Sequence, residues 1–290
     1  MKKISKGPLN RVAAIHDISG FGKCSMTVVL PILSAAGIET CCMPTAVLST
    51  HTGGFTGFTY RDLTADLPDF TKHWQSLNLK FSAVYTGFLG SAEQVNYVSD
   101  FIDTFKTPDT LIYIDPVMAD DGELYSVFDQ KMVEKMRELC IKADILLPNI
   151  TEAAFLLGED YQEGPYTREY VEKMVKRLAT LGPQKIVLTG VYFDQKNLGA
   201  ASYDAESECL DFSFSEKIMG HFHGTGDVFG SFCLAAILNG LNLKDATQFA
   251  VDLTQMCILR TVARETELRE GVDFEGVLPE MIKRLHLSAS

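Results

Sequence analysis

Short apolar runs alternate with amphipathic stretches along most of the chain, and this alternation constrains the fold more than any other feature of the sequence. Apolar runs of this length, separated by stretches of helical periodicity, are typical of a parallel sheet that helices cover on both faces. The predicted strands span residues 11–18, 40–48, 83–89, 111–117, 144–147 and 185–191. The sequence therefore predicts an α/β fold with a mostly parallel central sheet.

Helical periodicity fills the segments between several of these strands. The predicted helices span residues 25–36, 130–142 and 168–181. Residues 201–214 are expected to form a strand pair, and helices are expected to dominate from Asp227 onward. The chain contains no repeat, low-complexity tract or long linker, so we expect residues 1–290 to form one domain.

Composition limits the class of protein. Hydrophobic residues make up 46% of the chain and charged residues 22%, as in ordinary soluble globular proteins. The longest apolar runs, such as residues 232–238, are far shorter than the roughly 20 residues of a membrane-spanning helix, so we expect no membrane span. Residues 1–8 carry charge, and no apolar segment follows them until the predicted strand at residues 11–18, so we expect no secretory signal.

Charge and cysteine usage narrow the partners and the compartment. The 26 basic and 38 acidic residues give a net charge of −12, which disfavours nucleic acid as a partner. A local group of backbone amides can still bind an anionic small molecule. The cysteines form no CxxC pair, and this pattern favours buried thiols in a reducing, cytoplasmic location over a disulfide framework. They are Cys24, Cys41, Cys42, Cys140, Cys209, Cys233 and Cys257.

The loops after the predicted strands are the candidates for a binding site, because ligands of such sheets bind beyond the carboxyl ends of the strands. These loops carry small, polar or acidic residues. They are residues 17–20, 49–54, 86–88, 115–117, 148–152, 189–190 and 224–227. We expect them to converge on one crevice.

Gly224-Thr225-Gly226-Asp227 directly precedes an apolar helical run at residues 228–238. Glycines let the backbone direct several amides at one point, and the helix start adds free N–H groups, so the segment can bind an anion. A carboxylate repels a bound phosphate, so an aspartate at this position indicates a chemical function. The function that fits Asp227 is to accept a proton from an attacking hydroxyl. The alternative is that the segment only caps the helix.

Acidic and amide side chains follow two of the predicted strands. Asp115 and Asp120 follow one of them, and Asn149 and Glu152 follow the next. Mg²⁺ in phosphate-transfer sites takes one or two carboxylates and completes its shell with water and nucleotide oxygens, which fits this set. The alternative is structural, because residues 149–152 can open a helix with a capping box.

Two segments are similar to binding motifs without matching them. Residues 20–25 are superficially similar to a phosphate-binding P-loop, yet Asp17 stands where the pattern requires glycine and Cys24 where it requires serine or threonine. His221 and His223 have no further ligand nearby at metal-binding spacing, so we expect ordinary loop histidines.

Asp-Pro-Val at 115–117, Pro-Asn-x-x-Glu at 148–152 and Gly-Thr-Gly-Asp at 224–227 together resemble the ribokinase superfamily. Residues 45–53 (Thr-Ala-Val-Leu-Ser-Thr-His-Thr-Gly) are most similar to the pyridoxal (vitamin B6) kinases, and the resemblance covers nearly the whole chain. It implies a ribokinase-like three-layer α/β/α fold without a separate lid domain. It also implies ATP- and Mg²⁺-dependent phosphorylation of the 5′-hydroxymethyl group of pyridoxal, pyridoxine or pyridoxamine by a homodimer, and it leaves a monovalent-cation requirement open.

The resemblance implies roles for individual residues. Asp227 is the implied catalytic base, and the implied anion hole consists of Gly224, Thr225 and Gly226. The residues implied to bind the nucleotide are Asp115, Asn149, Glu152, Thr189, Gly190 and, on a flap at 121–125, Tyr125. The implied Mg²⁺ ligands are Asp115, Asp120 and Glu152. The residues implied to line the vitamer pocket are Asp17, Ser19, His51, Thr52 and Phe88.

Two positions depart from the family pattern. Asp17 stands where a serine is common, and a carboxylate there favours a protonated pyridine nitrogen or an amine, so a preference for pyridoxamine is a hypothesis. Leu147 stands where a threonine is common near the phosphates. The alternative functions are a hydroxymethylpyrimidine kinase or another small-molecule kinase of the superfamily, and a catalytically silent protein that binds pyridoxal phosphate.

Overall fold

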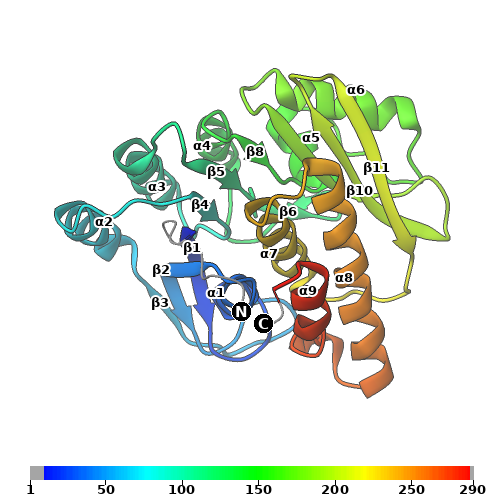
Figure 1. The fold of residues 1–290 in the computed structure, drawn as a ribbon, viewed down its shortest axis with the longest axis horizontal. Helices are drawn as coiled ribbons and strands as arrows, with labels where there is room; N and C mark the ends of the chain where they lie inside the picture. Colours follow the sequence, from blue (N-terminus) through cyan, green and yellow to red (C-terminus); the bar gives the residue numbers. More distant parts are fainter. Residues whose placement is uncertain (1–9, 288–290) are drawn as a thin grey trace.

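The computed structural model describes residues 10–287, so the charged segment 1–8 lies outside the described residues. Within this range, nine strands form one sheet in the order β11-β10-β9-β8-β5-β4-β1-β2-β3 (Figure 1). They are β1 (Arg11–Ser19), β2 (Glu39–Leu48), β3 (Tyr60–Asp62), β4 (Ala83–Thr86), β5 (Leu111–Ile114), β8 (Ile145–Leu146), β9 (Lys185–Val191), β10 (Asn197–Asp204) and β11 (Cys209–Glu216). β1, β2, β4, β5, β8 and β9 pair in parallel, whereas β3, β10 and β11 run antiparallel to their neighbours. The predicted mostly parallel sheet and the strand pair near residues 201–214 are confirmed.

Helices cover both faces of the sheet. On one face lie α2 (Leu67–Ser76), α3 (Ala92–Phe105), α4 (Gln130–Cys140), α5 (Ile150–Leu157) and α6 (Arg168–Ala179). On the other lie α1 (Met26–Ala35), α7 (Thr225–Leu238), α8 (Leu243–Arg264) and α9 (Leu278–Arg284). Two short 3₁₀ turns are η1 (Thr64–Asp66) and η2 (Leu268–Glu270). This is the expected three-layer α/β/α fold, and its described elements include no separate lid domain.

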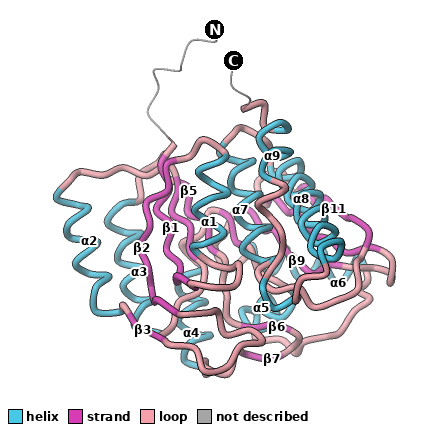
Figure 2. Tube along the Cα trace, turned by 90° about the horizontal axis from the view of Figure 1, so that it is seen from below, coloured by secondary structure: helices cyan, strands magenta, loops and turns pink. Residues whose placement is uncertain are grey.

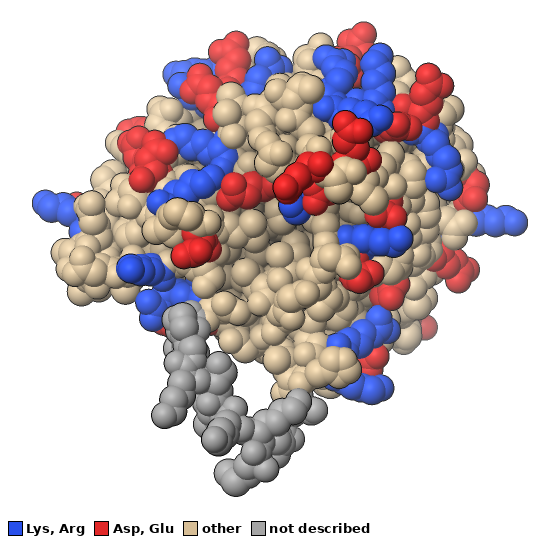
Figure 3. Space-filling view, turned by 45° about the horizontal axis from the view of Figure 1, so that its top comes forward, with Lys and Arg blue, Asp and Glu red and all other residues tan. Residues whose placement is uncertain are grey.

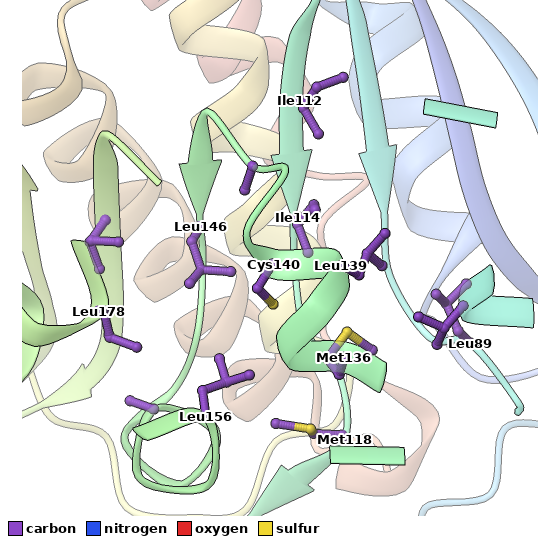
Figure 4. Close-up of a cluster of buried hydrophobic side chains, with 14 of the residues drawn as sticks. Leu89, Ile112, Ile114, Met118, Met136, Leu139, Cys140, Leu146, Leu156 and Leu178 are labelled. Atoms are coloured by element: carbon purple, nitrogen blue, oxygen red, sulfur yellow. The ribbon is translucent and has the colours of Figure 1, made fainter. Parts of the chain in front are cut away.

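Two buried apolar clusters, one on each face, hold the layers together, because strand side chains alternate between the faces. In β1, Ile15 belongs to the cluster that includes α3 to α6, and Ala14 belongs to the cluster that includes α1, α7 and α8. Figure 4 shows part of the first cluster, where Ile114 of β5 lies close to Leu139 of α4.

Three strands end earlier than the sequence predicts: β4 and β5 by three residues and β8 by one. Pro116 and Pro148, which follow β5 and β8, have no N–H to offer a neighbouring strand. After β4, the Phe88 carbonyl accepts a hydrogen bond from the Thr45 hydroxyl at 3.2 Å instead of from a strand. The early ends leave these residues in the loops at the carboxyl edge of the sheet.

A small hairpin stands apart from the main sheet. β6 (Ala119–Asp120) pairs antiparallel with β7 (Glu123–Leu124), and both lie at the lower edge of the molecule in Figure 2. Asp121 and Gly122 form the turn with φ values of 49° and 84°, the left-handed conformations that a type I′ turn requires. The Gly122 N–H donates to the Thr151 hydroxyl of α5 at 3.0 Å. The segment expected to be a flap is therefore a hairpin that α5 holds in place.

The seven cysteines are all free thiols, and Cys140, Cys233 and Cys257 are buried as expected. Cys209 is exposed, because it is the first residue of the edge strand β11. In the described part of the chain, no helix combines the length and the apolar character that crossing a membrane requires. On the face drawn in Figure 3, acidic and basic side chains are interspersed.

Gln94 of α3 ties the β2–β3 edge of the sheet to the body of the fold, and its side chain is fully buried. Its amide nitrogen lies 2.9–3.1 Å from the Thr45 carbonyl, the Asp62 carboxylate and the Thr64 hydroxyl. Its side-chain carbonyl accepts from the Gly90 N–H at 2.7 Å. One buried side chain thus forms hydrogen bonds with four segments: β2, β3, η1 and the loop before α3.

We expect Gln94→Ala to lower the free energy of unfolding by roughly 2–4 kcal/mol, because it leaves buried polar groups unpaired and opens a cavity. Urea unfolding followed by circular dichroism measures the change. Asn96→Ala, on the exposed side of the same helix, is the control and should change the free energy by less than about 0.5 kcal/mol. Equal losses in the two variants would contradict the role of Gln94.

Candidate active site

Parallel pairing brings the loops after the strands to one edge of the sheet. Along the chain, β1 is followed by β2 on one side, whereas β4 lies on its other side, so the strand order reverses at the β1–β4 border. Ligands of open α/β sheets bind at such a reversal. Asp17 and Ser19 lie at the end of β1, and Phe88 lies in the loop after β4. Three of the predicted vitamer-pocket residues therefore lie at this border.

The start of α7 forms a cradle of backbone amides. Gly224 precedes the helix with a φ of 75°, and a Cβ there would lie 2.0 Å from the Lys23 carbonyl oxygen, so only glycine fits. A Cβ on Gly226 would meet no protein atom within 4 Å, so the space above it is open to a ligand. The Thr225 hydroxyl donates to the Phe222 carbonyl at 3.1 Å and stabilises the turn into the helix. A helix N-terminus built this way favours an anion.

Asp227 lies in the first turn of α7 and is half-buried. Its side chain does not cap its own helix; the carboxylate accepts a hydrogen bond from the Ser25 N–H at 2.8 Å. Gly224 of the segment is the N-cap residue of α7, as the capping interpretation expects, but the Asp227 side chain takes no part in the cap. Burial raises its pKa to about 7, the Ser25 N–H opposes this shift, and the charge of Asp17 adds to it. A carboxyl group with a pKa near neutrality is suited to general-base chemistry.

Asp115 and Glu152 are both buried, at 7% and 3% exposure. Burial raises the pKa of both carboxyl groups, and the charges of Glu152 and Asp227 raise that of Asp115 further. Asp120 of β6 is exposed, and its charge acts on Glu152. Within residues 10–287, no lysine, arginine or histidine forms an ion pair with any of these carboxylates.

Carboxylates without a basic partner favour the binding of a cation, because buried carboxylates need a compensating charge. Across the described residues, no three His, Cys, Asp or Glu side chains are arranged as a ready-made metal site. A divalent cation held here would therefore take part of its shell from water or from a ligand, as Mg²⁺ does in phosphate-transfer sites.

The structural interpretation of residues 149–152 is confirmed. The Asn149 side chain accepts from the Glu152 N–H at 2.8 Å, and the Glu152 carboxylate accepts from the Asn149 N–H at 2.9 Å, which together form a capping box for α5. The other carboxylate oxygen of Glu152 accepts from the Met118 N–H at 3.1 Å. The Asn149 amide also donates to the Ala119 carbonyl at 2.8 Å. Both side chains thus fix the hairpin and α5 relative to each other.

Three further residues are predicted to bind the nucleotide: Thr189, Gly190 and Tyr125. Thr189 pairs with Asn149 in an isolated parallel bridge, and its hydroxyl lies 3.4 Å from the Pro148 carbonyl. Gly190 is exposed and has a φ of 76°. Tyr125, which follows β7, is 37% exposed, and burial and the surrounding carboxylates, Glu152 first, raise its pKa.

Asp17, near the end of β1, is 5% exposed and accepts a hydrogen bond from the Ser19 hydroxyl at 3.2 Å. Burial raises the pKa of Asp17, and hydrogen bonds from Ser25 and Ser19 oppose this shift. Phe88 is half-buried and stacks on Phe128 with ring centroids 5.4 Å apart. Thr52 is exposed and forms no hydrogen bond with the other predicted residues that the structure describes.

His51 is buried, and both of its ring nitrogens are engaged by the protein itself. Nε2 lies 2.7 Å from the Arg269 carbonyl, so it carries the proton, and Nδ1 accepts from the Gly53 N–H at 3.1 Å. His51 therefore lines the region with its ring and holds the loop after β2 to η2. The His223 ring lies 5.4 Å from that of His51 and 4.7 Å from that of His221.

Three residues near Asp17 were not predicted from the sequence: Cys24, Ser25 and Tyr60. Ser25 donates its backbone N–H to Asp227, and Cys24 lies close enough for Asp227 and Asp17 to raise its pKa beyond the effect of burial. The Tyr60 phenol is affected by the charge of Asp17, with burial as the larger cause of its raised pKa. No motif marks these residues; only the end of β1 and the start of α1, read as one loop, could have indicated Ser25.

Solved structures with the same fold include two bacterial proteins that are described as kinases of small molecules. A Bacteroides thetaiotaomicron protein provisionally named phosphomethylpyrimidine kinase, crystallised with pyridoxal, is 39% identical, with a TM-score of 0.90 over 94% of this chain and 96% of that chain. The pyridoxal kinase of Lactobacillus plantarum is 29% identical, with a TM-score of 0.88 over 98% of this chain and 100% of its own.

Among curated proteins, the pyridoxal kinase of Dictyostelium discoideum is 27% identical over 66% of this chain. The match spans 64% of that relative's length, and matches to the next two curated relatives span 60% and 59% of theirs. The family model for phosphomethylpyrimidine kinase matches residues 31–271, which is most of the chain. The protein therefore belongs to the phosphomethylpyrimidine kinase family, in the part of the ribokinase superfamily that includes its pyridoxal kinase relatives.

Proposed function

We propose that this protein is an ATP-dependent kinase that phosphorylates the 5′-hydroxymethyl group of a vitamin B6 compound: pyridoxal, pyridoxine or pyridoxamine. The observation that carries the proposal is the position of Asp227 at a helix N-terminus that glycines build. The charge of Asp17 raises the pKa of Asp227, and the charge of Asp227 raises the pKa of Asp115. A relative of this family with 39% identity was crystallised with pyridoxal.

In the proposed reaction, Asp227 accepts the proton of the 5′-hydroxyl as the oxygen attacks the terminal phosphorus of ATP. The bond from that phosphorus to the bridging oxygen of ADP breaks, and ADP leaves. The backbone amides of Gly224, Thr225 and Gly226 stabilise the negative charge of the transferred group. The carboxylate of Asp227 is held for this task by the Ser25 N–H at 2.8 Å.

The nucleotide is proposed to bind across the start of α5, β9 and the hairpin. Asn149, Thr189, Gly190 and Tyr125 would contact ATP, with the hairpin as the flap that excludes water. Asp115, Asp120 and Glu152 would hold Mg²⁺, which neutralises phosphate charge when bound. This assignment is supported by the lack of a basic partner for these carboxylates among residues 10–287 and by the raised pKa of Asp115 and Glu152.

The ring of the vitamer is proposed to lie at the β1–β4 border, against Asp17, Ser19, His51, Thr52 and Phe88. Because both His51 nitrogens are already hydrogen-bonded, His51 would contact the ring without a hydrogen bond. Asp17 is then the charged group that would face a pyridinium nitrogen or an amine. A homodimer and a cytoplasmic location remain predictions, which sedimentation and cell fractionation would test.

The direct test is a coupled assay of ATP consumption with each vitamer, with hydroxymethylpyrimidine as the competing substrate, and with and without Mg²⁺. Mg²⁺-dependent turnover of a vitamer supports the proposal. Turnover of hydroxymethylpyrimidine alone would assign the other activity of the family, and binding of pyridoxal phosphate without ATP consumption would indicate a catalytically silent protein.

Replacing the base should separate catalysis from nucleotide binding. We expect Asp227→Asn to lower kcat by roughly 10²–10⁴, the usual contribution of a general base, while ATP still binds in a fluorescence titration. Asp109→Asn, an exposed aspartate in the loop before β5, removes the same charge and should leave kcat unchanged. Near-normal turnover of Asp227→Asn would remove this residue from the mechanism.

The pKa of Asp227 sets the expected pH dependence. Because the base acts only when deprotonated and its pKa is raised to about 7, kcat/KM should rise with pH between roughly 6 and 8 and fall about tenfold per unit below 6. Initial rates at saturating MgATP between pH 5.5 and 8.5 measure the profile. A kcat/KM that is constant over this range would show that Asp227 does not titrate in the free enzyme.

Asp17 should determine which vitamer is preferred. A carboxylate at this position favours the cationic amine of pyridoxamine, and a hydrogen bond between charged groups is commonly worth a factor of about ten or more, so we expect pyridoxamine to have the highest kcat/KM. Asp17→Asn should bring the three kcat/KM values closer together. Equal kcat/KM for the three vitamers in the unaltered protein would contradict the preference.

A further inference from the structure

The turn of the β6–β7 hairpin is held from two sides. On one side, the Gly122 N–H donates at 3.0 Å to the hydroxyl of Thr151, which is buried in the first turn of α5. On the other side lies the ring of Tyr161, in the connection between α5 and α6 (residues 158–167). A Cβ on Gly122 would lie only 2.7 Å from Cδ1 of Tyr161, so this ring packs directly against the backbone of the turn.

Glycine is required at position 122 for two independent reasons. Its φ of 84° is a left-handed conformation that other residues rarely adopt. In addition, the Tyr161 ring occupies the place where a side chain would begin. The first reason belongs to the turn itself, whereas the second is a contact with a distant segment, so mutations can separate the two.

The same connection also packs against the segment that follows β9. The Tyr166 N–H donates to the Tyr192 carbonyl at 2.9 Å, and the two rings meet edge to face with centroids 5.2 Å apart. A Cβ on Gly164 would lie 2.5 Å from Cζ of Tyr192. Tyr192 directly follows β9, the strand that carries Thr189 and Gly190. The connection therefore contacts both segments between which the nucleotide is proposed to bind.

The ring of Tyr161, and not its hydroxyl, makes the contact with the hairpin. The three Tyr161 atoms nearest to a Cβ on Gly122 are the ring carbons Cδ1, Cε1 and Cγ. Tyr161 also packs against the apolar cluster that includes α3 to α6, so the core fixes the ring in turn. Phenylalanine would keep these contacts and alanine would lose them.

We propose that Tyr161 is a positioning residue for the nucleotide: its ring holds the β6–β7 hairpin in the arrangement that closes over ATP. This inference rests on the proposed function, because that function places the nucleotide beneath the hairpin. Tyr161 acts through the turn at Gly122. A hairpin of this kind determines how tightly the nucleotide is held and how well water is excluded.

Removing the ring should weaken nucleotide binding more than any other step. If the hairpin keeps its arrangement only about a tenth of the time in Tyr161→Ala, the Kd of MgADP and KM for ATP rise about tenfold. KM for the vitamer and kcat at saturating ATP should stay within about threefold of the unaltered protein. Isothermal titration calorimetry with MgADP and initial rates measure these constants.

Two further variants separate the ring from a general loss of structure. Tyr161→Phe keeps the ring and should bind MgADP like the unaltered protein. Tyr97→Ala removes a half-buried tyrosine of α3 that packs against the same apolar cluster, and it should leave the Kd of MgADP unchanged. The proposal is overturned if Tyr161→Ala binds MgADP normally, or if either of the other two variants weakens binding as much as Tyr161→Ala does.

A double-mutant cycle tests whether Tyr161 acts on the turn. In the unaltered protein, Gly122→Ala adds both a strained φ and a clash with the ring, whereas in Tyr161→Ala it adds the strain alone. We therefore expect Gly122→Ala to raise the Kd of MgADP by a larger factor in the unaltered protein. Equal factors in the two backgrounds would show that the ring does not act through Gly122.

Hydrogen exchange of the ligand-free protein separates this inference from the proposed function. In Tyr161→Ala, the amides of residues 119–124 should exchange faster, whereas those of α3 should be unaffected. Unchanged exchange in the hairpin would overturn the inference, whatever the substrate. If no vitamer is phosphorylated while the exchange and the Kd of MgADP change as expected, the proposed function fails and the role of Tyr161 stands.

Discussion

Parallel pairing of the central strands is the constraint on which the site depends. Because β1, β4, β5, β8 and β9 all end at the same edge, residues far apart in the chain are brought within electrostatic range of one another. Asp17 and Asp227 are separated by most of the sequence, yet each affects the chemistry of the same small region. The two apolar clusters above and below the sheet fix this edge, and the loops on it are free to carry polar groups.

The region concentrates negative charge that no basic side chain of the described residues neutralises. Backbone donors hold the carboxylates instead: the Ser25 N–H for Asp227, and the Asn149 and Met118 N–H groups for Glu152. The N-termini of α1, α5 and α7 all begin near these groups, and their positive dipole ends favour anions. Burial of several carboxylates without a basic partner costs stability, and in the proposed reaction these groups would serve a cation and proton transfer.

Features that depend on nearby residues were predictable from the sequence, whereas features that depend on distant residues were less so. Local patterns predicted the elements well: β9 has the predicted bounds, and β1 and α1 agree within one residue at each end. The Asn149–Glu152 capping box was also visible, because it needs only residues of one helical turn. The strand ends near Phe88 and Pro116 were less predictable, since a strand stops where its neighbour no longer offers a partner.

By itself, the sequence determined the α/β class, the glycine-rich segment 224–227 before a helix and the residue types gathered at the strand ends, because periodicity and loop composition are local properties. Only the tertiary structure decided that Asp227 is held by Ser25 instead of capping its helix and that both His51 nitrogens are already engaged. It also decided that Asp115 and Glu152 share a buried acidic environment. The physical reason is that hydrogen-bond partners and desolvation depend on which distant segments pack together, and no spacing along the chain encodes that.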